Sequence, residues 1–438
     1  MKENMKSLCR KILKYTQDSG AEKAECCLQL SRVIVVSVNN GKIYQINSTS
    51  REEALIRLIK EHRSISTIAS SFDFNAISNA VDDCIRAIES IEPDEHEDIS
   101  DGPVELAFID GDSSIDTLSL IELVQNYLND INTKYPQIIV SDLQLPAIDT
   151  SIVYGNTNQV ELAHSFIKYD CFIEYTSETD KQKCSYYYDF SFSKLPSKLL
   201  DLYEQCFWYN LKSNVTNFQR PSDIRNCKIL LAPSVVEDII IDGIYTFCNS
   251  VAIMSDASIW NKACNTAVAD KRLSIALDPY NESIICGERI TDNGTLSQPF
   301  YLIHNGILEN FCLSRKASSI SGFPMAANTS DSIVVSGGEH TFDEIISKIS
   351  CGIIISRFSG GDISLSGDFS GLAKNCYLIE NGEIVSSVND IRIYGNVVDM
   401  LNGIEDLSID HNINGYSIVP WALMDSGIFF GECDDLSE

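Results

Sequence analysis

The sequence predicts an α+β protein of two domains, and three observations carry this prediction. The chain has 438 residues, which is longer than a domain built on a single hydrophobic core usually is. Runs of β-branched residues that meet at Asn-Gly turns predict hairpins in both halves of the chain. Apolar residues at helical spacing lie between these runs. We therefore expect an N-terminal α+β domain over residues 1–218 and a β-rich C-terminal domain, with antiparallel sheets or a barrel and a core helix, over residues 219–438.

The N-terminal domain is expected to start with an amphipathic helix. Its apolar face is formed by Met5, Leu8, Cys9, Ile12 and Leu13. Two further helices are predicted at residues 74–91, behind Asp73 as N-cap, and at 119–131. The predicted strands are 25–38, 42–47, 52–62, 137–145, 152–154, 160–175 and 183–193. Local propensity favours a helix at 52–62, but we prefer a strand because tertiary context can override propensity. An acidic linker at 93–103 and a helix at 199–211 with Trp208 complete this domain.

The C-terminal domain is expected to contain a core helix followed by a β-rich remainder. A strand at 227–231 precedes Pro233, and one helical stripe then follows, formed by Val236, Ile240, Ile244, Phe247 and Val251. The β-rich remainder begins at 269–278. Hairpins are predicted at Asn305-Gly306 and Asn381-Gly382, because a tight type I′ turn needs positive φ at both central residues. Further strands are expected at 352–356, 390–394 and 427–431, with a helix after residue 396.

Charge and cysteine usage limit the classes of function. The formal charge of −29 opposes binding to a phosphate backbone, so nucleic acid is not an expected partner. The fifteen cysteines are scattered and odd in number, which indicates free thiols in a reducing cytoplasm. No apolar run reaches membrane-spanning length, and the N-terminal segment lacks the apolar stretch of a signal peptide. We therefore expect a cytoplasmic protein that does not bind membranes.

The most informative stretch covers residues 367–407. It reads GDFSG, then YLIENGEIVSSV, then IRIYGN before a helical segment. This arrangement resembles the signature of the TldD/PmbA family, and LIHNGILENFCLSRKAS at residues 302–318 resembles a second hairpin of that family. The matches near Met400 resemble the PmbA (TldE) branch in particular. Segments 286–300 and 416–432 depart from the family pattern.

The resemblance implies a heterodimer with a TldD-type peptidase subunit that cuts unfolded peptide. That subunit would hold zinc through an HExxxH motif on the first helix of its second domain. Here the corresponding helix carries Glu237, Asp238 and Asp242 instead of histidines. The six histidines of the chain form no pair at helical spacing. We therefore expect no catalytic residue, no metal site and no cofactor in this chain, with zinc in its partner.

Other chemistries remain as alternatives. Asp238 and Asp242 lie one helical turn apart, so they could face a hard cation such as Mg²⁺; a solvated helix face is the alternative interpretation. The chain has no G-x-S-x-G elbow, no P-loop and no G-x-G-x-x-G after a strand. A Cys/His nucleophile stays open, because many thiols and imidazoles are present.

Peptide held by strand addition needs exposed strand edges more than particular side chains. The candidate peptide-binding residues are Arg357, Asp368, Phe369 and Asn396, which flank the signature strands; structural roles in turns and strand ends are the alternative. The function expected is that of a non-catalytic PmbA/TldE-like subunit of a zinc metallopeptidase complex. An autonomous peptidase or hydrolase, for instance a homodimer, and a pure binding protein are the alternatives.

Overall fold

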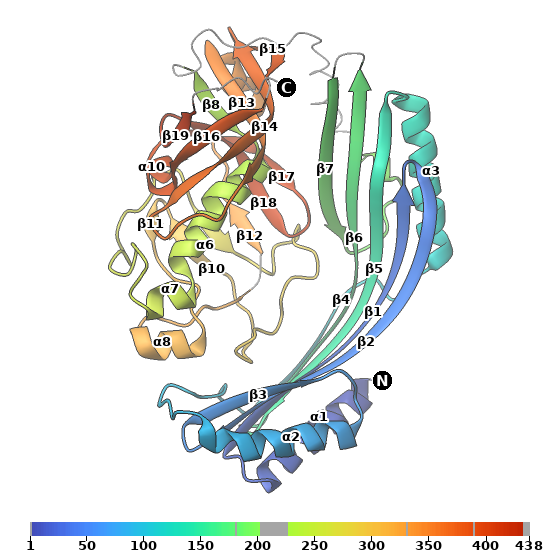
Figure 1. The fold of residues 1–438 in the computed structure, drawn as a ribbon, viewed down its shortest axis with the longest axis vertical. Coiled ribbons are helices and arrows are strands. Elements are labelled where there is room, and N and C mark those ends of the chain that lie inside the picture. Colours follow the sequence, from blue (N-terminus) through green and yellow to red (C-terminus); the bar gives the residue numbers. More distant parts are fainter. Residues whose placement is uncertain (1, 180–181, 202–226, 330–331, 389, 432–438) are drawn as a thin grey trace.

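The computed structural model describes residues 2–179, 182–201, 227–329, 332–388 and 390–431 (Figure 1). Residues 202–211 of the predicted helix, Trp208 included, lie outside the described residues. The expected domain boundary near residue 218 lies outside them as well. The chain forms an N-terminal part with one long curved sheet and a C-terminal part with a second sheet, which agrees with the predicted α+β class.

The elements of the N-terminal part are long strands with helices between them. The helices are α1 (Lys2–Asp18), α2 (Phe74–Ala87), the 3-10 helix η1 (Ile88–Ser90) and α3 (Thr117–Lys134). The strands are β1 (Lys23–Asn39), β2 (Lys42–Lys60), β3 (Arg63–Ala69), β4 (Val104–Gly111), β5 (Ile138–Asn156), β6 (Val160–Thr179) and β7 (Gln182–Phe192). Asp73 caps α2 as predicted, because its side chain accepts a hydrogen bond from the backbone of Asn75.

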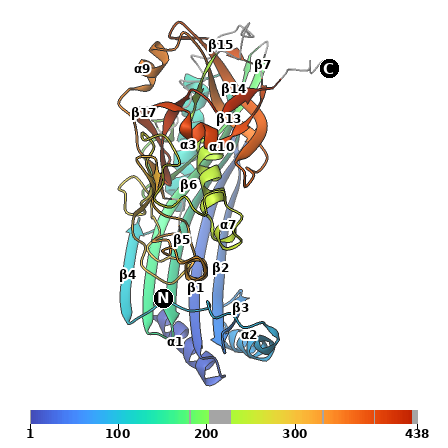
Figure 2. The same ribbon diagram turned by 90° about the vertical axis from the view of Figure 1, so that its left-hand side faces the viewer.

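The N-terminal sheet has the order β3-β2-β1-β5-β6-β4, with β7 paired to the other end of β6. Helices α1 and α2 pack on one end of its outer face, and α3 packs on the other end (Figure 1). Figure 2 shows the same strands running behind the C-terminal part. The inner face, which includes Tyr154 and Leu162, packs against Ile290 and Leu296 of the C-terminal part. The curved sheet therefore supports the C-terminal part on its inner face.

Several strands are longer than predicted. The strands predicted at 42–47 and 52–62 are one strand, β2, which ends at Lys60; Glu61 and His62 form the following turn and have positive φ. Residues 137–145 and 152–154 likewise belong to β5, although Pro146 lies inside it. Pro146 has no backbone N–H to donate. It is tolerated because β5 pairs with β6 at Gln144 and again at Ala147, and the two residues between them have no partner in β6. Strands β3 and β4 were not predicted.

The C-terminal part contains shorter elements. Its helical segments are α5 (Pro233–Val235), the π-helix η3 (Val236–Ile241), α6 (Asp242–Cys248), α7 (Ser250–Met254), α8 (Arg315–Ser321), α9 (Phe342–Ser347) and α10 (Val397–Asn402). Its first strands are β8 (Lys228–Leu231), β9 (Ile275–Leu277), β10 (Phe300–His304), β11 (Ile307–Leu308), β12 (Ile333–Val335) and β13 (Cys351–Gly360). The remaining strands are β14 (Asp368–Glu380), β15 (Glu383–Val388), β16 (Ile391–Asn396), β17 (Ile404–Ile413), β18 (Ser417–Met424) and β19 (Ile428–Phe430).

The second sheet is open, with β11 and β19 at its two ends, so the barrel alternative is wrong. Both predicted Asn-Gly hairpins are present: Asn305 and Asn381 have φ of 50° and 52°, and a glycine with positive φ follows each. Helices α6 and α10 pack against the sheet in one large apolar cluster that includes Phe247 and Met400. This cluster is the core of the C-terminal part.

The predicted core helix is not one regular helix. Its first part is the π-helix η3, and the regular segment α6 then ends at Asn249, which adopts an extended conformation. The Asn249 side chain accepts a hydrogen bond from Ala252 and donates to the carbonyls of Tyr245 and Thr246, so it caps both flanking segments. Val251 follows this break and is 71% exposed, so its assignment to the core stripe was wrong.

The prediction of free thiols is wrong for one pair. Cys227 precedes β8, and Cys351 begins β13, which pairs with β8 in parallel. Their Cα atoms lie 5.0 Å apart and their sulfurs form a disulfide. Cysteines 124 residues apart give no pairing signal in the sequence. Among the described helices, none is long and apolar enough to span a membrane.

Candidate functional site

Three carboxylates gather on the helical segment that leads into the C-terminal core. Val236, Ile239, Ile240 and Ile241 face inward from η3 and are buried. The wide π-turn leaves Glu237 and Asp238 on its other side, and Asp242 begins α6 directly after it. π-Helical turns are rare and often occur at functional sites. This segment is therefore the first candidate site, and it is also the segment for which the family resemblance implied zinc ligands.

Glu237 has the most strongly shifted carboxyl in this group. Burial raises the pKa of Glu237 to about 7, and the charges of Asp189, Asp238 and Asp242 act in the same direction. The hydroxyl of Ser417 donates a hydrogen bond to Glu237 and acts in the opposite direction. The side chain is half-buried, so loss of hydration is the physical cause that dominates. Glu237 therefore keeps its proton to a higher pH than an ordinary glutamate does.

The side chain of Asp238 is exposed to solvent, but protein atoms and the charged groups of Asp242, Arg357 and Asp189 lie near it. Burial by the surrounding protein raises the pKa of Asp238 to about 6, and the charge of Asp242 adds to this shift. Arg357, on β13, acts in the opposite direction on Asp238. The predicted peptide-binding residue Arg357 thus lies within electrostatic reach of the carboxylates, which sequence spacing did not suggest.

The N-terminal sheet reaches this group through β7. The Tyr416 hydroxyl donates a hydrogen bond to Asp189 of β7. The amide of Ser191, also on β7, donates to the carbonyl of Asn414 at 2.7 Å. Because Ser417 bonds to Glu237, the segment from Asn414 to Ser417 connects β7 to the carboxylates. The candidate site therefore lies where the two parts of the chain meet.

The residues present do not fit a zinc ion. Zinc sites in proteins are built mainly from histidine and cysteine, and this helical segment offers only carboxylates. Within the described ranges, no three His, Cys, Asp or Glu side chains are placed to share a metal. Three histidines instead bond to single carboxylates elsewhere: His164 to Asp110 at 2.8 Å, His304 to Glu309 at 3.1 Å and His340 to Asp406 at 2.7 Å. We therefore derive no metal-dependent step for this chain.

The signature residues lie together at the start of α10. Asp368 and Asn396 are directly opposite each other on β14 and β16. The Asn396 amide donates to Asp368 at 2.8 Å and to the carbonyl of Ser366, while its oxygen accepts from the Val398 amide and caps α10. Hydrogen bonds from Ser366 and Asn396 lower the pKa of Asp368. Phe369 is 4% exposed, and its ring contacts Phe358 edge-on at 5.9 Å. Arg357 lies on the adjacent strand β13, opposite Lys374 of β14.

Replacing Asn396 by alanine is expected to lower the free energy of unfolding by about 1–2 kcal/mol, because both the cap and the bond to Asp368 are lost. Asn402→Ala at the other end of α10 is the matched control, since Asn402 donates only one exposed hydrogen bond, to Val398. Urea denaturation of both variants checks this. Equal stability of the two variants contradicts the assigned role.

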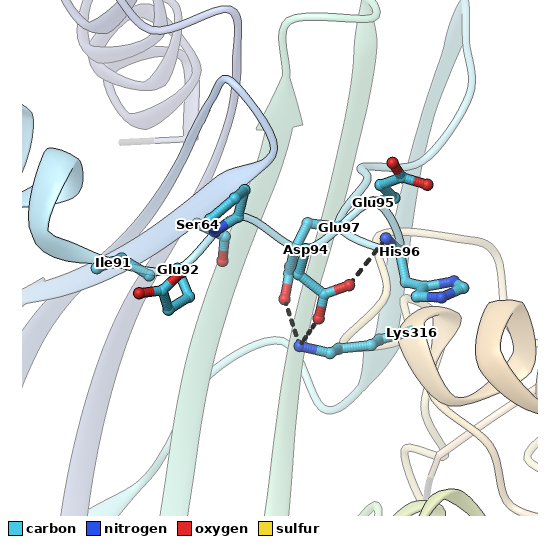
Figure 3. A pocket seen from close by; sticks show the side chains of 9 residues that line it. Ser64, Ile91, Glu92, Asp94, Glu95, His96, Glu97 and Lys316 are labelled. Atoms are coloured by element: carbon cyan, nitrogen blue, oxygen red, sulfur yellow. Dashed lines mark hydrogen bonds and ion pairs between the residues drawn. The ribbon is translucent and has the colours of Figure 1, made fainter.

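Sequence reasoning missed a second group of charged residues between the two parts. Lys316 of α8 lies 2.6 Å from Asp94 and 2.9 Å from Glu97, both in the acidic segment that the sequence indicated only as a linker (Figure 3). Arg57 of β2 also pairs with Glu97. The partly exposed carboxyl groups of Asp94 and Glu97 have lowered pKa values for this reason, although burial of Glu97 opposes its shift. Two features of the sequence could have indicated this group: the acidic segment 93–103 and the basic pair Arg315-Lys316 in SRKAS.

Comparisons with known proteins agree with this fold. Residues 224–428 match the family model "PmbA/TldA metallopeptidase C-terminal domain". A zinc metalloprotease TldD homologue from Saccharolobus solfataricus is 27% identical over 207 residues, which cover 42% of this chain and 44% of that protein. A metalloprotease from Methanocaldococcus jannaschii is 22% identical over 202 residues, covering 43% and 45%. The matches thus span less than half of the length of these relatives.

The crystal structure of TldE from Thermococcus kodakarensis superimposes with a TM-score of 0.82 and covers 96% of this chain and 99% of that one. Its sequence is 15% identical, so this likeness concerns the fold. The fold and the C-terminal sequence match define a protein related to metallopeptidases. More narrowly, residues 224–428 match the C-terminal domain of the TldD/PmbA family, and the relatives with sequence similarity include TldD homologues.

Proposed function

We propose that this chain is a PmbA/TldE-like subunit without a metal site of its own, which acts with a TldD-type zinc peptidase on unfolded peptides. One observation carries the proposal: Glu237, Asp238 and Asp242 occupy the helical segment on which the family resemblance implies zinc-binding histidines. The fold is retained while the ligands are replaced. A chain of this kind contributes surface to a complex and leaves hydrolysis to its partner.

Peptide capture in this proposal uses strand edges. Strands β3 and β19 stand at ends of their sheets, and each has one strand neighbour among the described residues. An extended peptide that adds to such an edge gains backbone hydrogen bonds without a required side chain. Arg357, Asp368 and Asn396 remain the proposed side-chain contacts. Phe369 is buried, so its contribution would be through its backbone.

The proposed complex is a cytoplasmic heterodimer, and a homodimer is the alternative for the chain alone. The net charge of −29 supports partners other than nucleic acid. A basic face on the peptidase subunit would complement this charge, because opposite charges speed encounter and orient the docking.

A second function is favoured by one observation. The raised pKa values of Glu237 and Asp238, about 7 and 6, are those of general acids or bases that work near neutral pH. An autonomous hydrolase would use them directly. This alternative expects turnover by the lone chain that is lost in Glu237→Gln.

The proposal is tested by peptide cleavage with the chain alone and co-expressed with a homologue that bears HExxxH. We expect no cleavage by the lone chain and cleavage by the pair. Replacing one zinc-binding histidine of the partner by alanine should abolish the activity of the pair. Cleavage that survives this replacement, or cleavage by the lone chain, contradicts the proposal and supports the autonomous hydrolase.

A further inference from the structure

Two adjoining pockets lie between the N-terminal and C-terminal parts, away from the carboxylates of η3. The larger has a volume of about 500 Å³ and is lined by the acidic segment 91–97, Ser64 and Lys316 (Figure 3). The smaller has a volume of about 160 Å³ and lies between β1, β2 and α8. His96 and Lys316 line both pockets, so the two are direct neighbours. Nothing in the proposed function uses this space.

Most charges around the smaller pocket are satisfied within the protein. Lys316 is paired with Asp94 and Glu97, as described above. Arg57 donates to Glu25 at 2.8 Å and also pairs with Glu97. Asp98 accepts from Lys23 at 2.6 Å. Lys316, Arg57 and Asp98 line the pocket, and each is already paired with an opposite charge of the chain.

Among the described residues, Arg315 and Asp292, which line the smaller pocket, form no ion pair, although the charge of Arg315 acts on Asp98 and helps to lower the pKa of that carboxyl. The half-buried Arg315 guanidinium donates one long hydrogen bond, of 3.4 Å, to the carbonyl of Asn293. Asp292 lines the same pocket, is exposed to solvent and does not form an ion pair with Arg315. A half-buried guanidinium normally has a carboxylate partner, because removing it from water is costly. The smaller pocket thus offers one cation and one anion.

The chain holds these two groups in place before any ligand arrives. Asp292 lies in a turn closed by hydrogen bonds between Thr291 and Thr295, at 2.9 Å between their backbones and 2.8 Å between their hydroxyls. The Asn293 side chain accepts from the Arg315 amide at 3.0 Å, which ties this turn to α8. The next residue, Gly294, packs against the Tyr154 ring of the N-terminal sheet. Rigid presentation of this kind reduces the entropy lost on binding.

We propose that the smaller pocket binds a free α-amino acid, with its carboxylate on Arg315 and its ammonium group on Asp292. Only a zwitterion satisfies both unpaired charges at once, and Arg suits carboxylates because its planar fork can bond to both oxygens. The volume corresponds to about five water molecules, which suits an amino acid with a small side chain. A longer side chain would extend past His96 into the larger pocket. This inference does not depend on the proposed peptidase partnership.

The test is isothermal titration calorimetry of the full chain with glycine and L-alanine at low ionic strength. We expect saturable binding that weakens about tenfold or more in Arg315→Gln and in Asp292→Asn. Arg86→Gln and Asp362→Asn remove exposed charges outside the pocket and should leave the affinity unchanged. Asp292 is exposed, so its variant keeps the test valid even where Arg315→Gln fails to fold.

Single-charge probes separate the zwitterion from simpler ligands. Acetate and methylamine should each bind at least about tenfold more weakly than glycine, because each satisfies one of the two charges. Acetate binding as tight as that of glycine would overturn the assignment and indicate a plain anion site. Absence of saturable heat with both amino acids, or equal affinities in Asp292→Asn and the parent chain, would overturn it as well.

Discussion

Replacing Gly294 by alanine is expected to lower the free energy of unfolding by about 3 kcal/mol. Gly294 has φ of +68°, and a Cβ there would lie 2.1 Å from the Tyr154 ring. The ring cannot easily move away, because its hydroxyl donates to Glu25 at 2.7 Å and the side chain is 5% exposed. Backbone strain at positive φ contributes about 1 kcal/mol and overpacking about 1–3 kcal/mol. The turn that carries Asp292 should therefore separate from the N-terminal sheet.

Two glycines serve as matched controls for this variant. Gly322 has φ of +77° with nothing within 4 Å of an added Cβ, so Gly322→Ala measures the backbone strain alone. Gly361 also has open space around its Cβ position and lacks positive φ, so Gly361→Ala should be nearly neutral. Urea denaturation gives the three values. A loss in Gly294→Ala no larger than that in Gly322→Ala would mean that the contact with Tyr154 does not hold the two parts together.

Glu237→Gln is expected to change how the free energy of unfolding depends on pH, and this is the second large effect. The pKa of Glu237 is raised from 4.5 to about 7 in the folded chain. A raised pKa means that the folded state binds the proton more tightly, so its stabilising contribution is full below pH 4.5 and is lost as pH rises through 7. The parent chain should therefore lose on the order of 3 kcal/mol of stability across this window through Glu237. Glutamine resembles the protonated form and has no such loss.

Denaturation at pH 5 and at pH 8 checks this expectation. The two chains should be similar in stability at pH 5, and Glu237→Gln should be the more stable at pH 8. Glu383→Gln, on the exposed hairpin after β14, controls for removal of one negative charge. If the difference between the parent chain and Glu237→Gln stays constant from pH 5 to pH 8, the carboxyl is not in the environment described here.

Sequence reasoning worked where the physical cause was local. Asn381 before Gly382 predicted a tight turn because both positions need positive φ, and the structure has this turn. Asp73 predicted a helix start because its side chain can accept from the backbone, and α2 begins there. The strand predicted at residues 52–62 against local propensity is present as the second half of β2, which ends at Lys60.

Failures arose where distant parts of the chain decide the outcome. Two strands were predicted at 137–145 and 152–154, but β5 runs through both because Pro146 falls where β5 has no partner residue in β6. The π-turn η3 buries three successive isoleucines, Ile239 to Ile241, whereas the predicted helical stripe included only Ile240 of these. Lys316 pairs with Asp94, 222 residues earlier, and no local pattern connects the two. The carboxylates of η3 were noted in the sequence, but their raised pKa values depend on burial and on Asp189 of β7.

The central claim is that this chain contributes no metal site to the complex that we propose. Elemental analysis of zinc tests it most directly, on the chain purified alone and after co-expression with an HExxxH-bearing homologue. We predict no bound zinc in the lone chain and about one zinc per pair in the complex, held by the partner. Stoichiometric zinc in the lone chain would contradict the account, because its ligands would have to come from side chains that we judged unfit for zinc.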